Sequence, residues 1–208
     1  MTALKVAAFD CDGVMFDTEA ANQAYYNDIL AHFSKPPMTG AQFAYCQMHT
    51  ADKAIAHLFR DPGEFAAAQA FRRKRGYGPY IRYMKMAPDL KEVLCWCRNG
   101  LKTAVATNRS DTMKRVLEEH GLQNCFDLVV TAMDVANPKP HPEQLCSIME
   151  RFRAGPREVL YIGDSQLDQY AAEAAGVVFA ACRNPGLSAD YYIDRLSEIK
   201  SIIAGRQQ

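Results

Sequence analysis

The sequence predicts an α/β fold, a Rossmann-like parallel sheet core with an inserted α-helical cap subdomain. Short apolar segments alternate with helical patterns along most of the chain. Apolar strands in such an alternation are typical of a parallel sheet that helices cover on both faces. One long interval breaks the alternation because it contains helical patterns alone.

Five short segments are predicted to be strands, since each is an apolar run of strand length. These segments are residues 4–9, 102–107, 127–132, 158–163 and 177–182. Helical patterns lie between or beside them, at about residues 89–99, 110–120, 141–153 and 166–175. The second of these helices opens with a Ser/Asp cap and closes on Gly121, and the last closes on Gly176.

The interval from about residue 18 to 87 holds helical patterns separated by turns that contain proline and glycine. A connection of this length is too long for an ordinary crossover between parallel strands. We therefore predict a helical cap over residues 17–87, inserted into a core formed by residues 1–16 and 88–208.

The composition argues against several classes of protein. Lysine plus arginine and aspartate plus glutamate each number 24, so no global positive field favours nucleic acid. No apolar run is long enough to span a membrane, and the apolar opening stretch is too short for a secretory signal. Seven scattered cysteines without a CxxC pair favour neither zinc nor a disulfide framework. We expect a cytoplasmic protein without nucleic-acid or membrane partners.

Acidic residues gather where predicted strands end. Asp10 and Asp12 follow the first strand, and Asp164 and Asp168 follow the fourth. The carboxyl ends of parallel strands meet at one edge, where ligands bind in open α/β sheets. Like charges repel and are costly to desolvate, so either these carboxylates spread into solvent or a cation gathers them.

Other polar residues follow the same strand ends. Thr107 and Asn108 end the second strand, Lys139 lies between two prolines after the third, and Ser165 follows the fourth. Singly, these residues suit a turn, a solvated loop and a helix N-cap, and a cap is the favoured role for Ser165. Their convergence with the carboxylates at one edge indicates a functional site.

In order and spacing, the segments FDCDGV, ATN, PKP and GDSQLD resemble the four motifs of the haloacid dehalogenase-like superfamily. The resemblance covers nearly the whole chain, including an α-helical cap between the first two motifs. The segment GDSQLDQYAAEAAGV is similar to the phosphatase and phosphomutase branch. The resemblance implies a Mg²⁺-dependent phosphatase, monomeric or homodimeric, that hydrolyses a small phosphorylated metabolite of the phosphoglycolate or sugar phosphate type through an aspartyl-phosphate intermediate.

The resemblance also implies roles for the acidic residues. Asp10 is expected to be the nucleophile and to bind Mg²⁺ together with Asp164 and the main-chain carbonyl of Asp12. The Asp12 side chain is expected to protonate the leaving alcohol and then to deprotonate the attacking water. Asp168 is expected to orient Lys139 or a metal-bound water.

The remaining motif residues are expected to hold the phosphoryl group. Gly13 permits a tight turn whose backbone N–H groups would cradle phosphate oxygens. Thr107 would donate its hydroxyl, and Asn108 would line the site through its backbone N–H. Lys139 would balance charge on the transferred group and on Asp10.

The helical cap is expected to act as a lid that excludes water and selects the leaving group. Residues 16–19 and 85–89 would form its hinges. Tyr45, His49 and Lys53 are candidates for substrate contact, although a helical core or surface role is the favoured interpretation for each.

Three alternatives stay open. A β-phosphoglucomutase-like phosphomutase resembles the chain in all four motifs, but it carries a histidine where this chain has Asn22, and a cap arginine that the stretch CQMHTADKA lacks. A dehalogenase is disfavoured by Asp12, because halide departure needs no proton. A non-catalytic binding protein on the same fold is the third, since a fold does not establish a function.

Overall fold

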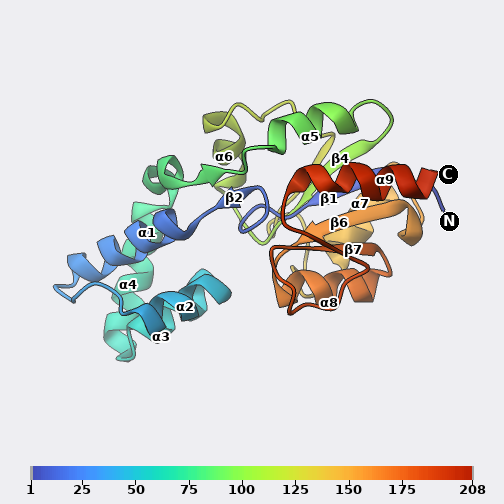
Figure 1. Ribbon diagram of the computed structural model, residues 1–208. Helices are drawn as coiled ribbons and strands as arrows, with labels where there is room; N and C mark the ends of the chain where they lie inside the picture. Colours follow the sequence, from blue (N-terminus) through green and yellow to red (C-terminus); the bar gives the residue numbers. More distant parts are fainter. Residues whose placement is uncertain (1, 208) are drawn as a thin grey trace. The chain divides into compact units, whose positions relative to one another are not determined.

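The computed structural model describes residues 2–207 of the chain. The larger of its two units is built around a six-stranded parallel sheet. The strands lie in the order β5-β4-β1-β6-β7-β8 (Figure 1). The predicted α/β fold with a parallel sheet core is therefore confirmed. The strands are β1 (Val6–Phe9), β4 (Lys102–Ala106), β5 (Leu128–Val130), β6 (Val159–Gly163), β7 (Val178–Cys182) and β8 (Tyr191–Ile193).

Helices cover both faces of the sheet, as its doubly buried central strands require. On one face, α7 (Glu143–Phe152) and α8 (Gln166–Ala175) pack against inward-facing residues of β1, β4, β6 and β7. Figure 1 shows α5 (Leu90–Cys97) and α9 (Ile199–Gln207) on the side opposite α8. The sheet thus forms the middle layer of three, and polar side chains gather where its strands end.

The register of the three central strands makes their carboxyl ends level. Phe9, the last residue of β1, pairs with Val105 of β4 and with Ile162 of β6. The segments that follow these strands therefore begin close together at one edge of the sheet, which is the edge that the motifs predicted.

Several elements differ from the sequence-based expectation. The helix α6 (Met113–Glu119) begins later than predicted, because Ser110 and Asp111 bond to one another through their side chains (3.1 Å) and do not cap it. The edge strand β8 was not predicted, since it is three residues long and buries only Ile193 fully. The C-terminal helix α9 was also not predicted.

The chain divides into two compact units, one formed by residues Thr18–Lys85 and the other by the segments that flank them. A two-stranded sheet pairs β2 (Phe16–Asp17) with β3 (Lys85–Met86), where the chain passes between the units. Within residues 2–207, no helix has the length and apolarity needed to cross a membrane. The helices of the smaller unit are α1 (Glu19–His32), α2 (Gly40–Met48), α3 (Ala51–Leu58), α4 (Pro62–Arg75) and the 3-10 helix η1 (Gly78–Tyr83).

A partly exposed polar contact joins three helices of this smaller unit. Asp28 of α1 accepts hydrogen bonds from the Tyr80 hydroxyl of η1 (2.6 Å) and from Arg75 Nε at the end of α4 (2.8 Å). The Tyr80 hydrogen bond and the Arg75 guanidinium hold the pKa of Asp28 below its usual range. These contacts connect α1, α4 and η1 within the smaller unit.

We predict that Leu145→Ala lowers the free energy of unfolding by about 2–5 kcal/mol, because Leu145 is fully buried between α7 and the sheet and its removal leaves a cavity. Urea denaturation measures the effect. Met133→Ala is the matched control, since Met133 is 69% exposed and its truncation should change stability by less than about 0.5 kcal/mol. Equal losses in the two variants would contradict the assignment of Leu145 to the core.

Candidate active site

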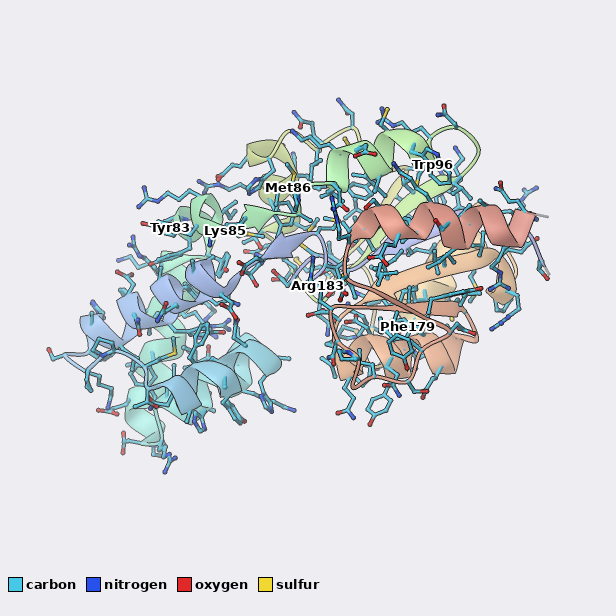
Figure 2. All side chains as sticks on the ribbon, in the orientation of Figure 1. Tyr83, Lys85, Met86, Trp96, Phe179 and Arg183 are labelled. Carbon is cyan, nitrogen blue, oxygen red and sulfur yellow. The ribbon has the colours of Figure 1, made fainter. Side chains whose placement is uncertain are left out.

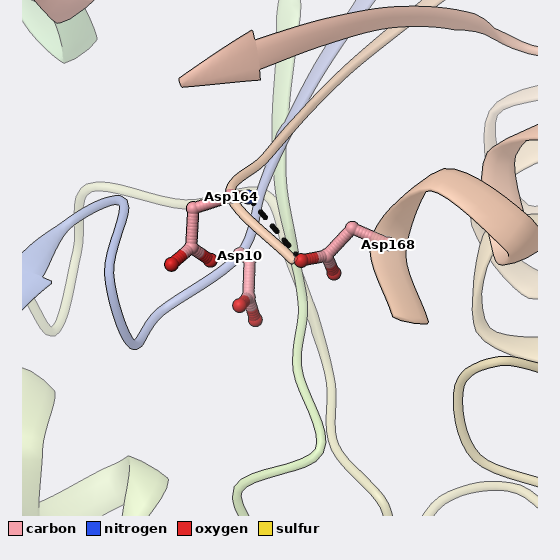
Figure 3. Close-up of side chains that lie close together, drawn as sticks. All are labelled: Asp10, Asp164 and Asp168. Atoms are coloured by element: carbon pink, nitrogen blue, oxygen red, sulfur yellow. Dashed lines mark hydrogen bonds between the residues drawn. The ribbon is translucent and has the colours of Figure 1, made fainter. Parts of the chain in front are cut away.

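Three carboxylates meet at the carboxyl edge of the sheet (Figure 3). Asp10 follows β1, Asp164 follows β6, and Asp168 lies in the first turn of α8. One carboxylate oxygen of each lies within 4.8 Å of the other two. Asp10 and Asp168 are buried, and Asp164 is half-buried. The structure thus brings Asp10 and Asp164 together at this edge with Asp168, and the Asp12 carboxylate is not one of the three.

Lys139 comes from the loop after β5, and its side chain is only 3% exposed. Its Nζ lies 2.8 Å from Asp10 Oδ1 and 2.6 Å from Asp168 Oδ1. It also donates to the carbonyl of Ala106 (3.1 Å) and to the hydroxyl of Tyr161 (2.8 Å). A lysine with four such neighbours is a fixed charge inside the site, in contrast to an ordinary solvated lysine in a loop.

Asp168 is surrounded by hydrogen-bond donors. Its Oδ1 accepts from Lys139 and from the Tyr161 hydroxyl (2.6 Å), and its Oδ2 accepts from the backbone N–H groups of Ser165 (3.0 Å) and Asp164 (3.3 Å). Ser165 is the N-cap of α8, because its hydroxyl accepts from the Asp168 N–H at 3.3 Å. Asp168 therefore fixes Lys139 and ties the start of α8 to the end of β6.

The pKa values of the three acids shift in opposite directions, because those of Asp10 and Asp164 rise while that of Asp168 falls. Burial raises the pKa of Asp10 despite the nearby Lys139 ammonium, and burial with the Asp10 and Asp168 charges raises the pKa of Asp164 to about 8. Burial alone would raise the pKa of Asp168, but Lys139, Ser165 and Tyr161 hold it below its usual range. Burial opposes the charge of Lys139, yet Asp10 and Asp168 raise its pKa above the usual value. Asp10 and Asp164 are thus the acids of the cluster whose ionised forms are least compensated by their neighbours.

Gly13 supplies space beside Asp164. Its φ is +79°, a conformation that favours glycine, and a Cβ at this position would lie 1.9 Å from Asp164 Oδ2. The Gly13 N–H donates to the carbonyl of Phe16 at 2.8 Å. In this structure Gly13 therefore contributes backbone geometry and room for a carboxylate, and its N–H is used within the turn.

Thr107 and Asn108 connect the end of β4 to the neighbouring loops. Thr107 is buried, and its carbonyl accepts a hydrogen bond from Gln144 of α7 at 2.7 Å. The Asn108 side chain donates to the carbonyl of Lys139 at 2.8 Å. Asn108 thus holds the backbone that carries the buried ammonium, a contact that was not predicted from the sequence.

The Asp12 carboxylate lies outside the group of three. It pairs with Arg109, whose Nη2 donates to Asp12 Oδ1 at 2.5 Å. The structure therefore gives the Asp12 side chain a different partner from Asp10 and Asp164, although Asp12 follows Asp10 closely in the loop after β1.

The loop after β7 also reaches the site. Arg183, labelled in Figure 2, has a positive φ of 54° and donates to the carbonyls of Gly13 and Val14. Its neighbour Asn184 donates to the carbonyl of Asp164 at 2.8 Å. These two side chains hold the loops after β1 and β6 beside each other.

Sequence reasoning missed Arg109, Tyr161 and Gln144. Arg109 directly follows the motif ATN, which is a signal that could have been used. Tyr161 places a hydroxyl inside an otherwise apolar strand, and Gln144 is a fully buried amide on α7. Polar groups inside buried segments generally have a hydrogen-bonding task, so both positions carried a sequence-level hint.

Tyr45 and His49, two of the candidates for substrate contact, make contacts with other residues of the helical unit. The ring of Tyr45 stacks on His49 (3.9 Å between centroids) and on His57 (4.0 Å). Asn22, where a phosphomutase has histidine, donates to Gln47 at 2.5 Å and accepts from the Tyr77 hydroxyl at 2.6 Å. Asn22 therefore belongs to an amide and phenol network inside this unit.

Lys53 is exposed on α3. Its backbone N–H donates to the N-cap residue Thr50 at 3.4 Å. This placement fits the surface role that was favoured for Lys53, and its proposed contact with substrate stays a prediction.

Comparisons with known proteins agree on one family. A family model described as haloacid dehalogenase-like hydrolase matches residues 7–182. A haloacid dehalogenase superfamily hydrolase of subfamily IA from Geobacter sulfurreducens has a similar solved structure, with a TM-score of 0.86, 36% identity and 97% of each chain covered.

Two named relatives are similar in sequence. The chain is 27% identical to a phosphoglycolate phosphatase from Pectobacterium atrosepticum over 92% of its own length and 83% of that protein. It is 32% identical to a pyrophosphatase PpaX from Bacillus cereus over 51% of its own length and 54% of that protein. The chain therefore spans about half of the second relative.

We predict that Tyr161→Phe lowers the free energy of unfolding by about 1–3 kcal/mol, because Lys139 loses a buried acceptor and Asp168 loses a buried donor. Urea denaturation of the metal-free protein measures the loss. Tyr170→Phe on α8 is the matched control, since Tyr170 is 45% exposed. Similar stability of both variants would show that the hydroxyl of Tyr161 is dispensable.

A second prediction concerns pH. A carboxyl whose pKa is higher in the folded state than in the unfolded state contributes stability below its unfolded pKa and loses it as pH rises through the folded value. For Asp164 this window runs from its ordinary 3.8 to about 8. In metal-free protein, Asp164→Asn should therefore gain stability relative to wild type as pH rises, by on the order of 1–3 kcal/mol between about pH 5 and pH 8.5.

Urea denaturation in EDTA at several pH values measures this difference. Asp194→Asn, at an exposed aspartate beyond β8, is the matched control over the same range. A flat profile for Asp164→Asn would contradict the raised pKa of Asp164.

Proposed function

The chain belongs to the haloacid dehalogenase-like hydrolase family, and from this membership we propose that it is a Mg²⁺-dependent phosphatase acting on a small phosphorylated metabolite through an aspartyl-phosphate on Asp10. The observation that carries the proposal is the grouping of Asp10, Asp164 and Lys139 at the carboxyl edge of the sheet. The relative named phosphoglycolate phosphatase supports the choice of phosphate monoesters.

The residues present fit a magnesium ion. Three carboxylates face one ammonium in a largely buried place, which leaves a formal charge of −2. Mg²⁺ prefers oxygen ligands and is typically held by one or two carboxylates. Asp168 is already engaged by Lys139 and Tyr161, so Asp10, Asp164 and the main-chain carbonyl of Asp12 would hold the ion. When bound, Mg²⁺ offsets the negative charge of the carboxylates and of a substrate phosphate.

Asp10 would attack phosphorus. Its Oδ1 lies beside Lys139 Nζ, and the ammonium would offset the charge that opposes the approach of a carboxylate to a phosphate dianion. The bond from Asp10 to phosphorus forms as the bond to the leaving oxygen breaks, and Asp12 gives that oxygen a proton. Water then attacks phosphorus, Asp12 takes its proton, and the Asp10 carboxylate is regenerated with release of phosphate.

Thr107 and Asn108 would complete the phosphate site. The Thr107 hydroxyl would donate to a phosphoryl oxygen, and the backbone N–H of Asn108 would line the site. The side chain of Asn108 already holds the carbonyl of Lys139, so the same residue would position both the ammonium and the transferred group.

The helical unit Thr18–Lys85 would be the lid of this enzyme. Its closure would exclude water and select the leaving group, with a phosphoglycolate or sugar phosphate as the substrate type. A phosphomutase is disfavoured because Asn22 is an amide held by Gln47 and Tyr77, where the mutase has a histidine.

The decisive experiment is turnover of p-nitrophenyl phosphate with Mg²⁺ and with EDTA. We predict Mg²⁺-dependent turnover that Asp10→Asn lowers on the order of 10³-fold or more, because the nucleophile is removed. Asp194→Asn should leave turnover unchanged. Absence of metal-dependent turnover in the wild type would overturn the proposal and favour a binding protein.

Phosphate release from a panel of phosphorylated metabolites then ranks the substrates. Incubation of β-glucose 1-phosphate with a bisphosphate primer tests the phosphomutase alternative. A mutase would yield glucose 6-phosphate, whereas a phosphatase would release phosphate.

A further inference from the structure

Arg109 is a nearly buried guanidinium next to Asp12. Its side chain is 7% exposed, whereas that of Asp12 is 38% exposed. Its Nη2 donates to Asp12 Oδ1, so the contact uses one of the two carboxylate oxygens. The guanidinium thus lies on the protein side of Asp12, where it touches the carboxylate and is largely shielded from solvent.

Several contacts fix Arg109 in this place. Its Nη1 donates to the Thr112 hydroxyl at 3.2 Å, and its backbone N–H donates to the Thr107 hydroxyl at 3.2 Å. Its carbonyl accepts from the backbone N–H of Ala132 at 3.2 Å. These contacts restrict the movement of the Arg109 side chain. The guanidinium therefore holds the Asp12 carboxylate in one position.

We propose that Arg109 is the positioning residue for acid–base catalysis by Asp12. It holds Oδ1 so that Oδ2 faces the leaving oxygen and then the attacking water. This inference rests on the proposed function and goes beyond it, because it assigns a task to a residue outside the four motifs. A fixed guanidinium with several donors suits such orientation of a carboxylate better than a flexible lysine does.

The proton movements define what Arg109 affects. In the first step, the proton leaves Asp12 Oδ2 for the leaving oxygen as the bond from that oxygen to phosphorus breaks and Asp10 bonds to phosphorus. In the second step, a proton of water moves to Asp12 Oδ2 as the water oxygen bonds to phosphorus and the Asp10 bond breaks. Misplacement of Asp12 therefore slows departure of an alkoxide, which needs the proton, more than departure of p-nitrophenolate, which does not.

The test compares kcat/KM for two substrates, because kcat/KM covers the steps up to departure of the leaving group. Arg109→Gln should lower kcat/KM for an alkyl phosphate, phosphoglycolate, about 10–100-fold more than kcat/KM for p-nitrophenyl phosphate. Arg109→Lys should recover part of the difference. Arg115→Gln is the control, since Arg115 makes an exposed pair with Glu119 on α6.

Combination with Asp12→Asn separates orientation from a general effect on folding. If Arg109 acts through Asp12, Arg109→Gln adds little loss on phosphoglycolate once Asp12 is asparagine. Equal losses on both substrates, no loss, or an additive loss in the double variant would overturn the assignment. A wild-type protein that turns over neither substrate with Mg²⁺ would instead overturn the proposed function.

Discussion

The arrangement at the edge of the sheet depends on one buried ammonium group. Lys139 Nζ lies 2.8 Å from Asp10 and 2.6 Å from Asp168, and all three side chains are largely withdrawn from water. Removing one partner from such a buried group typically costs about 3–5 kcal/mol, because the remaining charge is left uncompensated. The loop of Lys139, the end of β1 and the start of α8 are therefore held together by charges that are costly to bury separately.

A second constraint is close approach of the backbone. A Cβ on Gly163 would lie 2.3 Å from the Cβ of Asp168, and a Cβ on Gly13 would lie 1.9 Å from Asp164 Oδ2. Glycine at these two positions lets the acids come within reach of one another. The ammonium of Lys139 attracts the carboxylates of Asp10 and Asp168. The absence of a side chain at Gly13 and Gly163 leaves the space that Asp164 and Asp168 occupy.

The sequence predicted what depends on strand ends, and missed what depends on tertiary contact. Apolar runs located the central strands, and the polar residues behind them located Asp10, Lys139 and Asp168. The pairing of Asp12 with Arg109 was missed because the two residues are 97 positions apart, and no local pattern records such a contact. The edge strand β8 was missed because a short strand with one buried residue lacks an apolar run.

The central place of β1 in the sheet has a consequence for biosynthesis. Strand β1 hydrogen-bonds to β4 on one side and to β6 on the other, and β6 is made roughly 150 residues after β1. At the usual pace of translation this delay lasts roughly 10–30 s. During that time the nascent segment Val6–Phe9 has no lateral neighbour on the β6 side, so the central pairing of the sheet forms only after the last quarter of the residues printed here begins to be made.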